Sequence, residues 1–484
     1  MRRHGDGIGD LAGITAQLDY LAGLGATALW LTPIRPSPSC HGYDVTGYLA
    51  SKPDLGARDD LIALVQAASA RGVRVILDLV VDHTSDKHPF FQDAWDNPQS
   101  NLADWYLWTN DDRTAYQSFG GYKGMPKLNH ANPEVVAYVL EIARFWMDLN
   151  GDRNYADGVD GFRCDVAKQV PLATWQARRA KTRRLNPQSF LLAEVWDMNA
   201  RNLGKWYDDA FDAVFNFPLY SDLAGSNDVS GDSLLAGVQR PDMVSYTLLC
   251  ESKLLPPGFQ IVQFVNNHDT NRVMSDVEGD WVRARTAATL NLTLPGAPMI
   301  YYGEETGMKG EKGRANPYWD EYRREPMDWY TAETGPGMLT WFKPKNRYNA
   351  PDDGISVQEQ AGVAGSLLSR YQALTALRQA HPALHRGAFA PAKVAESKAV
   401  YAYSRHAPPD AGSPQEWFLV ILNFGGEPQQ ATIELDLAYP GPYSAVDALG
   451  CQPWPDVPAG QPYQVEMPAA SSVVLQLSPK PSSP

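Results

Sequence analysis

The stretch "GVDGFRCDVAK", residues 158–168, has the composition of a buried strand but carries charged side chains. An apolar run from Val159 to Val166 is typical of a parallel strand that is covered on both faces. Arg163 and Asp165 interrupt this run, and because they lie two positions apart they point to the same side of a strand. The pair is either a structural ion pair or a carboxylate held in place for chemistry.

Other stretches of this kind alternate along the chain with amphipathic helical patterns. Together they predict seven buried parallel strands, at 26–33, 73–83, 158–165, 190–196, 213–218, 261–269 and 298–305. The clearest helical patterns between them lie at 59–72, 133–149 and 282–294. Steady alternation of strand and helix predicts a parallel sheet with crossovers, one strand short of a closed eightfold barrel.

Two regions break this alternation. Residues 84–132 are polar and aromatic without clear periodicity, and they are too long for an ordinary loop, which indicates an inserted subdomain. Residues 385–484 alternate like antiparallel strands between turns, which predicts a C-terminal β-sandwich. We therefore predict an α/β fold: a (β/α)8 TIM barrel (1–83 and 133–384) whose first strand is missing, with the subdomain inserted after its third strand.

The totals exclude several classes of protein. The 484 residues carry a formal charge of −14, which argues against nucleic acid or an anionic membrane surface as partner. No run of about 18 apolar residues predicts a membrane span, and the first residues lack the apolar segment of a signal peptide. The four cysteines lie far apart without metal-binding spacing, so we interpret them as free thiols.

Polar residues gather where the predicted strands end, which is where barrel enzymes carry their functional side chains. These residues are His83, Arg163, Asp165, Glu194, His268 and Asp269. Carboxylates in this number suit glycoside cleavage, in which one attacks the anomeric carbon and another, about 5–5.5 Å away in retaining enzymes, protonates the leaving oxygen. Each residue alone is more often structural than catalytic, so the prediction depends on the group.

Two electrostatic expectations follow. Arg163 should favour the charged form of Asp165 and keep it ionised as a nucleophile. Glu194 follows four apolar residues, so partial desolvation should raise its pKa as a general acid requires.

Six motifs stand in a fixed order along the chain. Four are "DLVVDH" (78–83), "GFRCDVAK" (161–168), "LLAEVWD" (191–197) and "FVNNHD" (264–269), and two more are "HGYDVTGY" (41–48) and "MPKLN" (125–129). They resemble the four hallmark motifs and two further motifs of glycoside hydrolase family 13, the α-amylase family. The resemblance covers about residues 5–480, including the barrel, the inserted domain and the β-sandwich.

The resemblance implies a role for each matching residue. Asp165 would be the nucleophile, Glu194 the general acid/base, and Asp269 a third carboxylate that grips sugar hydroxyls and favours the oxocarbenium-like transition state. Arg163 would position Asp165. The residues expected to contact the sugar are Tyr43 as a stacking platform, Asp44, His83, Lys168 on the leaving-group side, and His268.

The sequence departs from the family pattern in places. Asp82 stands where the family usually has Asn, so the extra charge is expected to alter the network between barrel and inserted domain, or a metal site. "MPKLN" resembles the neopullulanase and cyclomaltodextrinase branch. "HTSDKHPFF" (83–91) and "YWDEYRREPMDW" (318–329) resemble the oligo-1,6-glucosidase and bacterial α-amylase neighbourhood instead.

The segment "GDGIGDLAGI" (5–14) resembles a loop in which relatives often bind calcium. Arg2 and His4 stand where the first two oxygen ligands would be. The remaining ligands are Asp6, the carbonyl of Ile8, and Asp10. Calcium requires six to eight oxygens, so we expect either a weak structural calcium site or a Gly-rich turn capped by Asp10. No organic cofactor is expected.

Only four residues precede Gly5, so the first barrel strand has no counterpart. Its absence would leave two barrel strands with unpaired edges. We therefore expect the natural protein to carry about 20 or more further residues, a strand of about 5–6 and a possible leader of about 15–30. As written the chain is expected in the cytoplasm; a leader would make it secreted.

The leading hypothesis is a retaining α-glucan hydrolase, an α-amylase that cleaves internal α-1,4 bonds as a monomer. The alternatives are an exo-acting oligo-α-glucosidase, a cyclomaltodextrinase or neopullulanase, and a transglycosylase or isomerase of the same family. A non-catalytic relative is expected to lose catalytic carboxylates, and this chain keeps all three. Glu304 and Glu305 are assigned structural roles. Three tryptophans either line outer sugar subsites or pack: Trp196, Trp319 and Trp329.

Overall fold

The computed structural model describes residues 8–225, 233–238, 240–256, 260–313, 319–340, 347–409, 415–436, 442–458 and 460–480. The chain divides into two compact units. The first comprises Met1–Phe215, Leu255–Gln260 and Leu339–Trp341, and the second comprises Asn216–Leu254, Ile261–Met338 and Phe342–Pro484. Within the described ranges, no helix combines the length and apolar character needed to cross a membrane.

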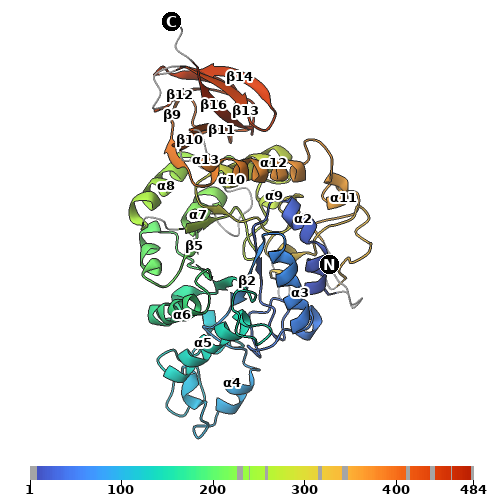
Figure 1. Cartoon of the computed structure of the whole chain (residues 1–484), viewed down its shortest axis with the longest axis vertical. Coiled ribbons are helices and arrows are strands. Elements are labelled where there is room, and N and C mark those ends of the chain that lie inside the picture. Colours follow the sequence, from blue (N-terminus) through green and yellow to red (C-terminus); the bar gives the residue numbers. More distant parts are fainter. Residues whose placement is uncertain are drawn as a thin grey trace. The chain divides into compact units, whose positions relative to one another are not determined.

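Five parallel strands form the sheet of the first unit. They are β1 (Ala28–Leu31), β2 (Arg74–Leu79), β3 (Gly161–Cys164), β4 (Phe190–Ala193) and β5 (Ala213–Phe215), of which β2 and β5 are labelled in Figure 1. Each pairs with the next one along the chain, so that Leu77 lies opposite Leu31 on one side and Phe162 on the other. This sequential order is the one that βα units produce in a barrel.

The described part of the first unit contains six helices, two of which match the amphipathic patterns predicted at 59–72 and 133–149. They are α1 (Leu11–Ala16), α2 (Leu18–Gly23), α3 (Arg58–Ser69), α4 (Pro89–Ala94), α5 (Pro133–Met147) and α6 (Leu172–Leu185). Helix α5 begins at Pro133, where the side chain of Asn132 accepts a hydrogen bond from the Glu134 N–H, and it buries Val139 and Trp146. Short 3₁₀ turns lie at Pro53–Leu55, Ala103–Trp105, Phe119–Gly121, Ala167–Gln169, Ala200–Asn202 and Gly204–Tyr207.

The segment 84–132 has a small aromatic core. Phe91, Trp105, Tyr106 and Leu128 pack together there with Val135 of α5. Isolated antiparallel bridges, such as Tyr106 with Leu128, replace regular strands. The division of the chain into barrel, inserted subdomain and sandwich at the predicted boundaries stays a prediction.

The second unit carries two further parallel strands and most of the remaining helices. Strand β6 (Gln260–Gln263) pairs in parallel with β7 (Ala297–Pro298). The helices are α7 (Phe217–Ala224), α8 (Asp242–Leu254), α9 (Val273–Asp276), α10 (Trp281–Thr293), α11 (Val357–Gln360), α12 (Leu367–Ala380) and α13 (Pro382–His385), with a 3₁₀ turn at Glu321–Arg324.

All seven predicted parallel strands are present, but each ends earlier than predicted, and the last one differs most. Sequence predicts a strand over 298–305, whereas β7 ends at Pro298. The Met299 N–H still donates to the Gln263 carbonyl at 2.8 Å, and the chain then turns, with the Glu304 N–H bound to the Tyr301 carbonyl and Gly303 at φ +79°. The acidic pair that follows therefore lies in a turn.

The C-terminal region consists of two antiparallel sheets, as predicted. One has the strand order β14-β13-β16-β11-β10-β8 and the other β15-β12-β9. The strands are β8 (Ala388–Pro391), β9 (Lys393–Ala395), β10 (Val400–Ala407), β11 (Glu416–Asn423), β12 (Gln429–Glu434), β13 (Tyr443–Asp447), β14 (Gln452–Val457), β15 (Tyr463–Met467) and β16 (Ser472–Pro479). Apolar side chains from both sheets form one core.

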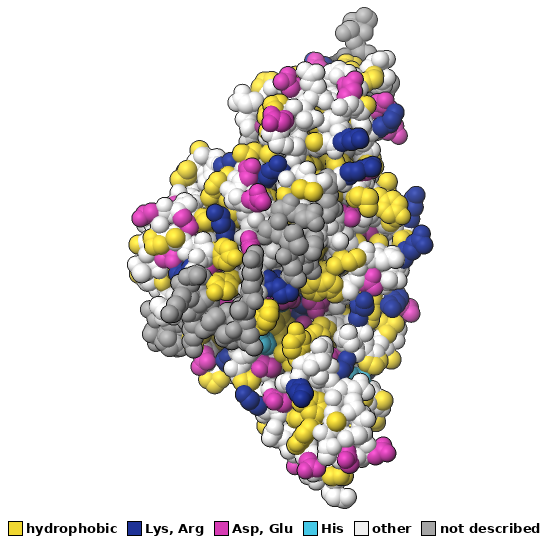
Figure 2. All heavy atoms as spheres, turned by 180° about the vertical axis from the view of Figure 1, so that it is seen from behind, with side chains coloured by type: hydrophobic (Ala, Val, Ile, Leu, Met, Phe, Trp, Pro, Cys, Tyr) yellow, Lys and Arg dark blue, Asp and Glu magenta, His cyan; other side chains and the backbone are white. Residues whose placement is uncertain are grey.

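The surface carries both signs of charge. On the face shown in Figure 2, Lys and Arg side chains are interspersed with Asp and Glu rather than gathered in one patch.

Candidate active site

The ends of β3 and β4 bring two of the predicted carboxylates together. Asp165 follows β3 directly and Glu194 follows β4. The parallel register continues past the strands, because the Glu194 N–H binds the Cys164 carbonyl at 3.0 Å and the Ala167 N–H binds the Glu194 carbonyl at 2.9 Å. Neighbouring parallel strands therefore place both side chains at the same edge of the sheet.

Arg163 joins these carboxylates through one guanidinium. Its Nη1 lies 2.6 Å from Asp165 Oδ1 and its Nη2 lies 2.7 Å from Glu194 Oε1. Nη1 also lies 3.0 Å from Oδ2 of Asp78, a residue of β2. The side chains of all four residues are at most 7% exposed, so a single buried cation serves three buried carboxylates.

Asp78 is a member of this group that the sequence analysis did not single out. Besides Arg163, its Oδ2 accepts hydrogen bonds from Tyr43 Oη at 3.1 Å and from Trp30 Nε1 at 3.2 Å. The backbone carbonyl of Asp78 accepts a further bond from Arg35. A charged residue inside the apolar run of β2 was the signal that could have identified it.

The net shift in the pKa of Asp165 is opposite in direction to the one expected from Arg163. Burial raises the pKa of Asp165 well above its usual value, and the nearby Glu194 and Asp78 carboxylates raise it further. Arg163 lowers the pKa of Asp165, as predicted, but this contribution is smaller than that of burial. Three carboxylates around one guanidinium favour retention of one proton, which suits a pair that works as nucleophile and acid.

The backbone at Val166 helps to hold Glu194. Val166 adopts the left-handed conformation (φ 38°, ψ 48°), which a β-branched residue rarely does. In this conformation its N–H donates to Glu194 Oε2 at 2.8 Å. Strain of this kind clusters at functional sites, where the surrounding structure holds it.

Arg163 and its three carboxylates, Asp78, Asp165 and Glu194, are called the Arg163 group. Two of the predicted sugar contacts lie close to it. The guanidinium of Arg163 lies 5.8 Å from the centre of the half-buried Tyr43 ring. His83, which follows β2, has its Nε2 3.2 Å from the Tyr43 carbonyl oxygen. The structure therefore brings Tyr43 and His83 into the same group as Arg163 and Asp165.

The other two predicted contacts of the first unit have different partners. The carboxylate of Asp44 accepts hydrogen bonds from the hydroxyls of Ser37 and Ser39. Lys168 donates to the Trp196 carbonyl at 3.2 Å and pairs with Asp197 at 3.3 Å, and its side chain is 43% exposed. Both sugar-binding roles stay predictions.

His268 and Asp269 lie in the second unit, in the loop that follows β6. Asp269 Oδ2 lies 3.1 Å from His268 Nε2, and Oδ1 lies 2.8 Å from Arg324 Nη2. Arg324 Nε also donates to the His268 carbonyl at 2.9 Å, and Arg323 donates to the Asp269 carbonyl. The Asp269 side chain is 29% exposed. Sequence reasoning missed both arginines because they lie about 55 residues further along the chain.

The other residues singled out from the sequence are distributed as follows. Glu304 is buried and accepts a hydrogen bond from Tyr371 Oη at 2.6 Å, and burial raises the pKa of Glu304 to about 7. Trp196 and Trp319 are 37% and 47% exposed, whereas Trp329 is half-buried.

The proposed calcium ligands are only partly described. Asp6 lies outside the described residues. Asp10 caps helix α1, with its Oδ1 accepting a hydrogen bond from the Gly13 N–H at 2.6 Å, and it lies two residues after Ile8. In the part of the chain that the structure describes, no group of three or more His, Cys, Asp or Glu side chains is arranged to hold a metal ion. Calcium binding stays a prediction, and no step of the chemistry depends on it.

Comparison with known proteins places this geometry in context. The family described as "Alpha amylase, catalytic domain" matches residues 1–387. "Alpha-amylase 3" of Dictyoglomus thermophilum is 34% identical over 400 residues, which are 79% of this chain and 75% of that protein. "Neopullulanase 2" of Thermoactinomyces vulgaris is 33% identical over 346 residues, which are 69% of this chain but only 54% of that protein.

A solved structure extends the likeness to almost the whole chain. The crystal structure of an alpha-amylase from H. orenii superposes with a TM-score of 0.81 at 30% identity, and the match covers 99% of this chain and 97% of that one. Together with the sheets described above, this likeness confirms the predicted fold class, a (β/α)8 barrel with a C-terminal antiparallel β-sandwich.

Proposed function

Because the chain belongs to the α-amylase family of glycoside hydrolases, we propose that it cleaves α-1,4-glucosidic bonds of starch or maltodextrins with retention of anomeric configuration. The observation that carries this proposal is the Arg163 group, in which Asp165 and Glu194 each contact one nitrogen of the same guanidinium. Two carboxylates held side by side at strand ends are what a retaining glycosidase requires.

In the first step, a carboxylate oxygen of Asp165 attacks the anomeric carbon. The bond from that carbon to the glycosidic oxygen breaks, and the leaving oxygen takes a proton from Glu194. The product is an ester between the sugar and Asp165. Arg163 holds Asp165 at 2.6 Å and is itself anchored by Asp78, so the nucleophile has little freedom to turn away.

In the second step, the Glu194 carboxylate takes a proton from water. The resulting hydroxide oxygen attacks the anomeric carbon, the ester bond breaks, and Asp165 leaves as a carboxylate. Two inversions give net retention, and Glu194 ends the cycle protonated again. If a sugar hydroxyl replaces water, the same intermediate leads to transglycosylation.

Asp269 is proposed to bind sugar hydroxyls and favour the oxocarbenium-like transition state. Its carboxylate is partly exposed and held by His268 and Arg324, so it has fixed geometry and an accessible surface for a ligand. His83 and His268 are proposed as sugar contacts beside the scissile bond, and Tyr43 as the platform on which the sugar stacks.

Internal cleavage by an α-amylase is preferred because the two relatives named alpha-amylase match most of this chain. The similarity to a neopullulanase supports a second candidate that differs in the bonds or chain lengths it accepts. The monomeric state and the lack of a nucleic-acid partner stay predictions.

The test is the product profile of purified protein with soluble starch, followed over time by carbohydrate chromatography. A ladder of maltooligosaccharides at early times supports internal cleavage. Glucose alone from the outset supports the exo-acting alternative, and a new disaccharide linkage supports a transglycosylase.

The variant Asp165→Asn is the control for the active-site assignment. It should lower turnover by a factor on the order of 10⁴ or more, while maltoheptaose still binds in calorimetry. Unchanged turnover would overturn the assignment of Asp165.

A further inference from the structure

A buried ion pair joins the loop after β2 to the segment 124–128. Asp82 Oδ1 lies 2.9 Å from the Lys127 ammonium nitrogen, and the side chains are 1% and 15% exposed. The Asp82 carboxylate is withdrawn from water and the Lys127 side chain is largely so, which means that loss of the cation would leave a buried carboxylate without a counter-charge. The family pattern resembled by this sequence usually has a neutral Asn at position 82, so the carboxylate of Asp82 departs from that pattern, whereas Lys127 belongs to the "MPKLN" motif.

The second oxygen of Asp82 faces the ring of His83. Asp82 Oδ2 lies 3.4 Å from His83 Nδ1, and the opposite ring nitrogen faces the Tyr43 carbonyl. Phe119 stacks on the imidazole, with ring centres 5.0 Å apart and planes 23° apart. The His83 backbone carbonyl accepts a hydrogen bond from Tyr48 Oη at 2.9 Å. The His83 ring therefore has a polar contact at each nitrogen and a stacking contact on one face.

Backbone hydrogen bonds support the pair from the segment that carries Lys127. The Leu128 N–H binds the Asp82 carbonyl at 2.8 Å, and the Thr84 N–H binds the Pro126 carbonyl at 3.1 Å. His83 and Lys127 form an antiparallel bridge between these two bonds. These contacts hold the backbone of Lys127 beside that of Asp82, which keeps the ammonium within reach of the carboxylate.

The same ammonium reaches the loop that follows β3. Lys127 Nζ donates to Gln169 Oε1 at 3.1 Å. Gln169 ends the 3₁₀ turn Ala167–Gln169, which starts directly after Val166, the residue whose N–H holds Glu194. One cation therefore bridges oxygens on the loops after β2 and β3.

We propose that Asp82 and Lys127 are positioning residues for substrate: their ion pair fixes the His83 ring and the two loops beside it, and thereby sets the affinity for sugar. The part that concerns sugar rests on the function proposed above. Neither residue touches Arg163, Asp165 or Glu194 in the described contacts, so the pair acts on binding more than on bond cleavage.

The experiment compares Lys127→Met, Asp82→Asn and the double variant. Lys127→Met leaves a buried carboxylate without its cation, and we expect KM for maltoheptaose to rise about tenfold with kcat within about twofold. Adding Asp82→Asn removes the unpaired carboxylate, so the double variant should regain the melting temperature lost in Lys127→Met, while KM should stay raised at least about threefold because the pair is still absent. A double variant with the KM of the wild type would contradict the role of the pair.

A matched control comes from the longer inserted segment 84–132, to which Lys127 also belongs. Arg113 pairs with Asp104 at 2.7 Å, with side chains 24% and 76% exposed. Arg113→Met removes a cation of the same segment that does not contact His83, and KM should not change. If Lys127→Met lowers only the melting temperature and leaves KM unchanged, the pair is structural and the proposal is wrong.

Ring ¹⁵N shifts of His83, assigned with His83→Gln, test the first half without any substrate. We expect these shifts to change in Asp82→Asn and in Lys127→Met but not in Arg113→Met. Unchanged shifts overturn the proposal even if the enzyme is active. If the starch assay shows no cleavage but the shifts change, the proposed function fails while the positioning of His83 stands.

Discussion

Two arginine–carboxylate groups, one in each unit, differ in how far they are withdrawn from water. In the first unit, Arg163 and its three carboxylates are at most 7% exposed. In the second unit, Asp269 is 29% exposed and Arg324 18%. The closest contacts are nearly equal, 2.6 Å for Arg163 with Asp165 and 2.8 Å for Arg324 with Asp269.

Contact distance alone does not rank the strength of these two ion-pair groups. A charge pair far from water interacts strongly, and removal of one partner leaves an uncompensated charge. An accessible pair is weakened by water and salt and contributes little to folding. We therefore propose that the Arg163 group contributes to both folding stability and catalysis. The Arg324 group, which consists of Arg324, Asp269 and His268, is proposed to contact ligand.

The largest effect is expected for Arg163→Gln. Three buried carboxylates lose their shared cation, so the free energy of unfolding should fall by about 3–5 kcal/mol, and kcat/KM by a factor on the order of 10³. Denaturant unfolding and starch kinetics measure the two quantities. If Arg163→Gln retained more than a tenth of the activity, the role assigned to Arg163 in catalysis would be wrong.

Arg324→Gln should have a smaller effect of a different kind. Its ion pair is accessible, so the free energy of unfolding should change by no more than about 1 kcal/mol. In this variant Asp269 still contacts His268 but loses the charged hydrogen bond from Arg324. Because that bond is lost, kcat/KM should fall about tenfold. In high salt this loss should shrink, whereas the loss in Arg163→Gln should not. Equal salt dependence of both variants would break the comparison.

A pH profile sharpens the comparison on the buried side. Burial and the neighbouring carboxylates raise the pKa of Asp165, and the attacking form is the ionised one, so kcat/KM should fall on the acid side at a pH above the usual value for Asp. Glu194→Gln removes one of the carboxylates that raise this pKa. An aryl maltoside, whose leaving group needs no protonation, would serve as substrate for this variant. The pH at which kcat/KM falls on the acid side should then be lower by about one unit. An acid limb that stays in place would contradict the assigned cause.

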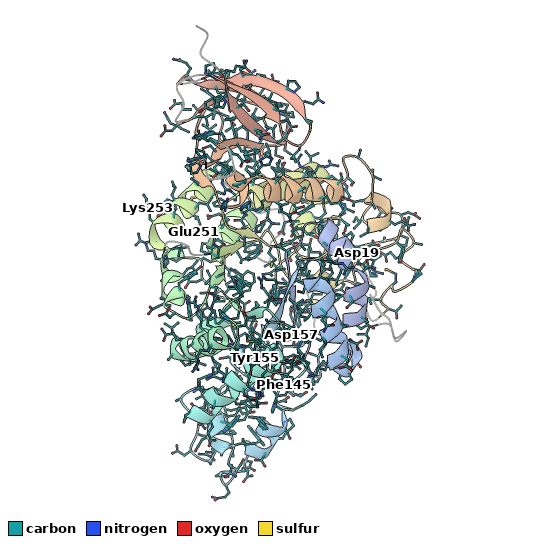
Figure 3. All side chains as sticks on the ribbon, viewed as in Figure 1. Asp19, Phe145, Tyr155, Asp157, Glu251 and Lys253 are labelled. Atoms are coloured by element: carbon teal, nitrogen blue, oxygen red, sulfur yellow. The ribbon has the colours of Figure 1, made fainter. Side chains whose placement is uncertain are left out.

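Glu251 on α8 (Figure 3) is a buried carboxylate without a guanidinium partner among the described residues, so its substitution should leave turnover unchanged. Its Oε2 accepts from Asn216 Nδ2, and burial raises the pKa of Glu251 to about 8. Since the unfolded state loses this proton near pH 4.5, the free energy of unfolding should fall by up to about 1.4 kcal/mol per pH unit from there to about pH 8. Glu251→Gln should lack this loss in denaturant unfolding at several pH values; an unchanged slope would refute it.

The sequence predicts much of this architecture because its signals are local. Apolar runs mark each parallel strand, and polar residues at their ends mark Asp165 and Glu194. Asp78 was missed because its partners, Trp30 and Tyr43, lie 35 or more residues away and meet it only in the fold. The net direction of the Asp165 pKa shift also depends on packing, since burial outweighs the adjacent Arg163.

Strand lengths were less predictable than strand positions. The residues after Pro298 have strand-like composition, yet the chain turns soon after Met299, where Gly303 has a positive φ and the Glu304 N–H binds the Tyr301 carbonyl. The ion pair of Asp82 with Lys127 was equally hidden, because it joins residues 45 positions apart in the chain through the fold of the inserted segment.

The most direct test of the central claim is to trap the sugar on its nucleophile. Glu194→Gln enzyme would be treated with an activated glycosyl fluoride whose ring carries a second fluorine, which slows breakdown of the ester, and then digested for peptide mass spectrometry. We predict one added sugar on the peptide that contains Asp165, and none in the Asp165→Asn, Glu194→Gln double variant. A label on the Asp269 peptide, or no label while the fluoride is consumed with inversion, would contradict the account.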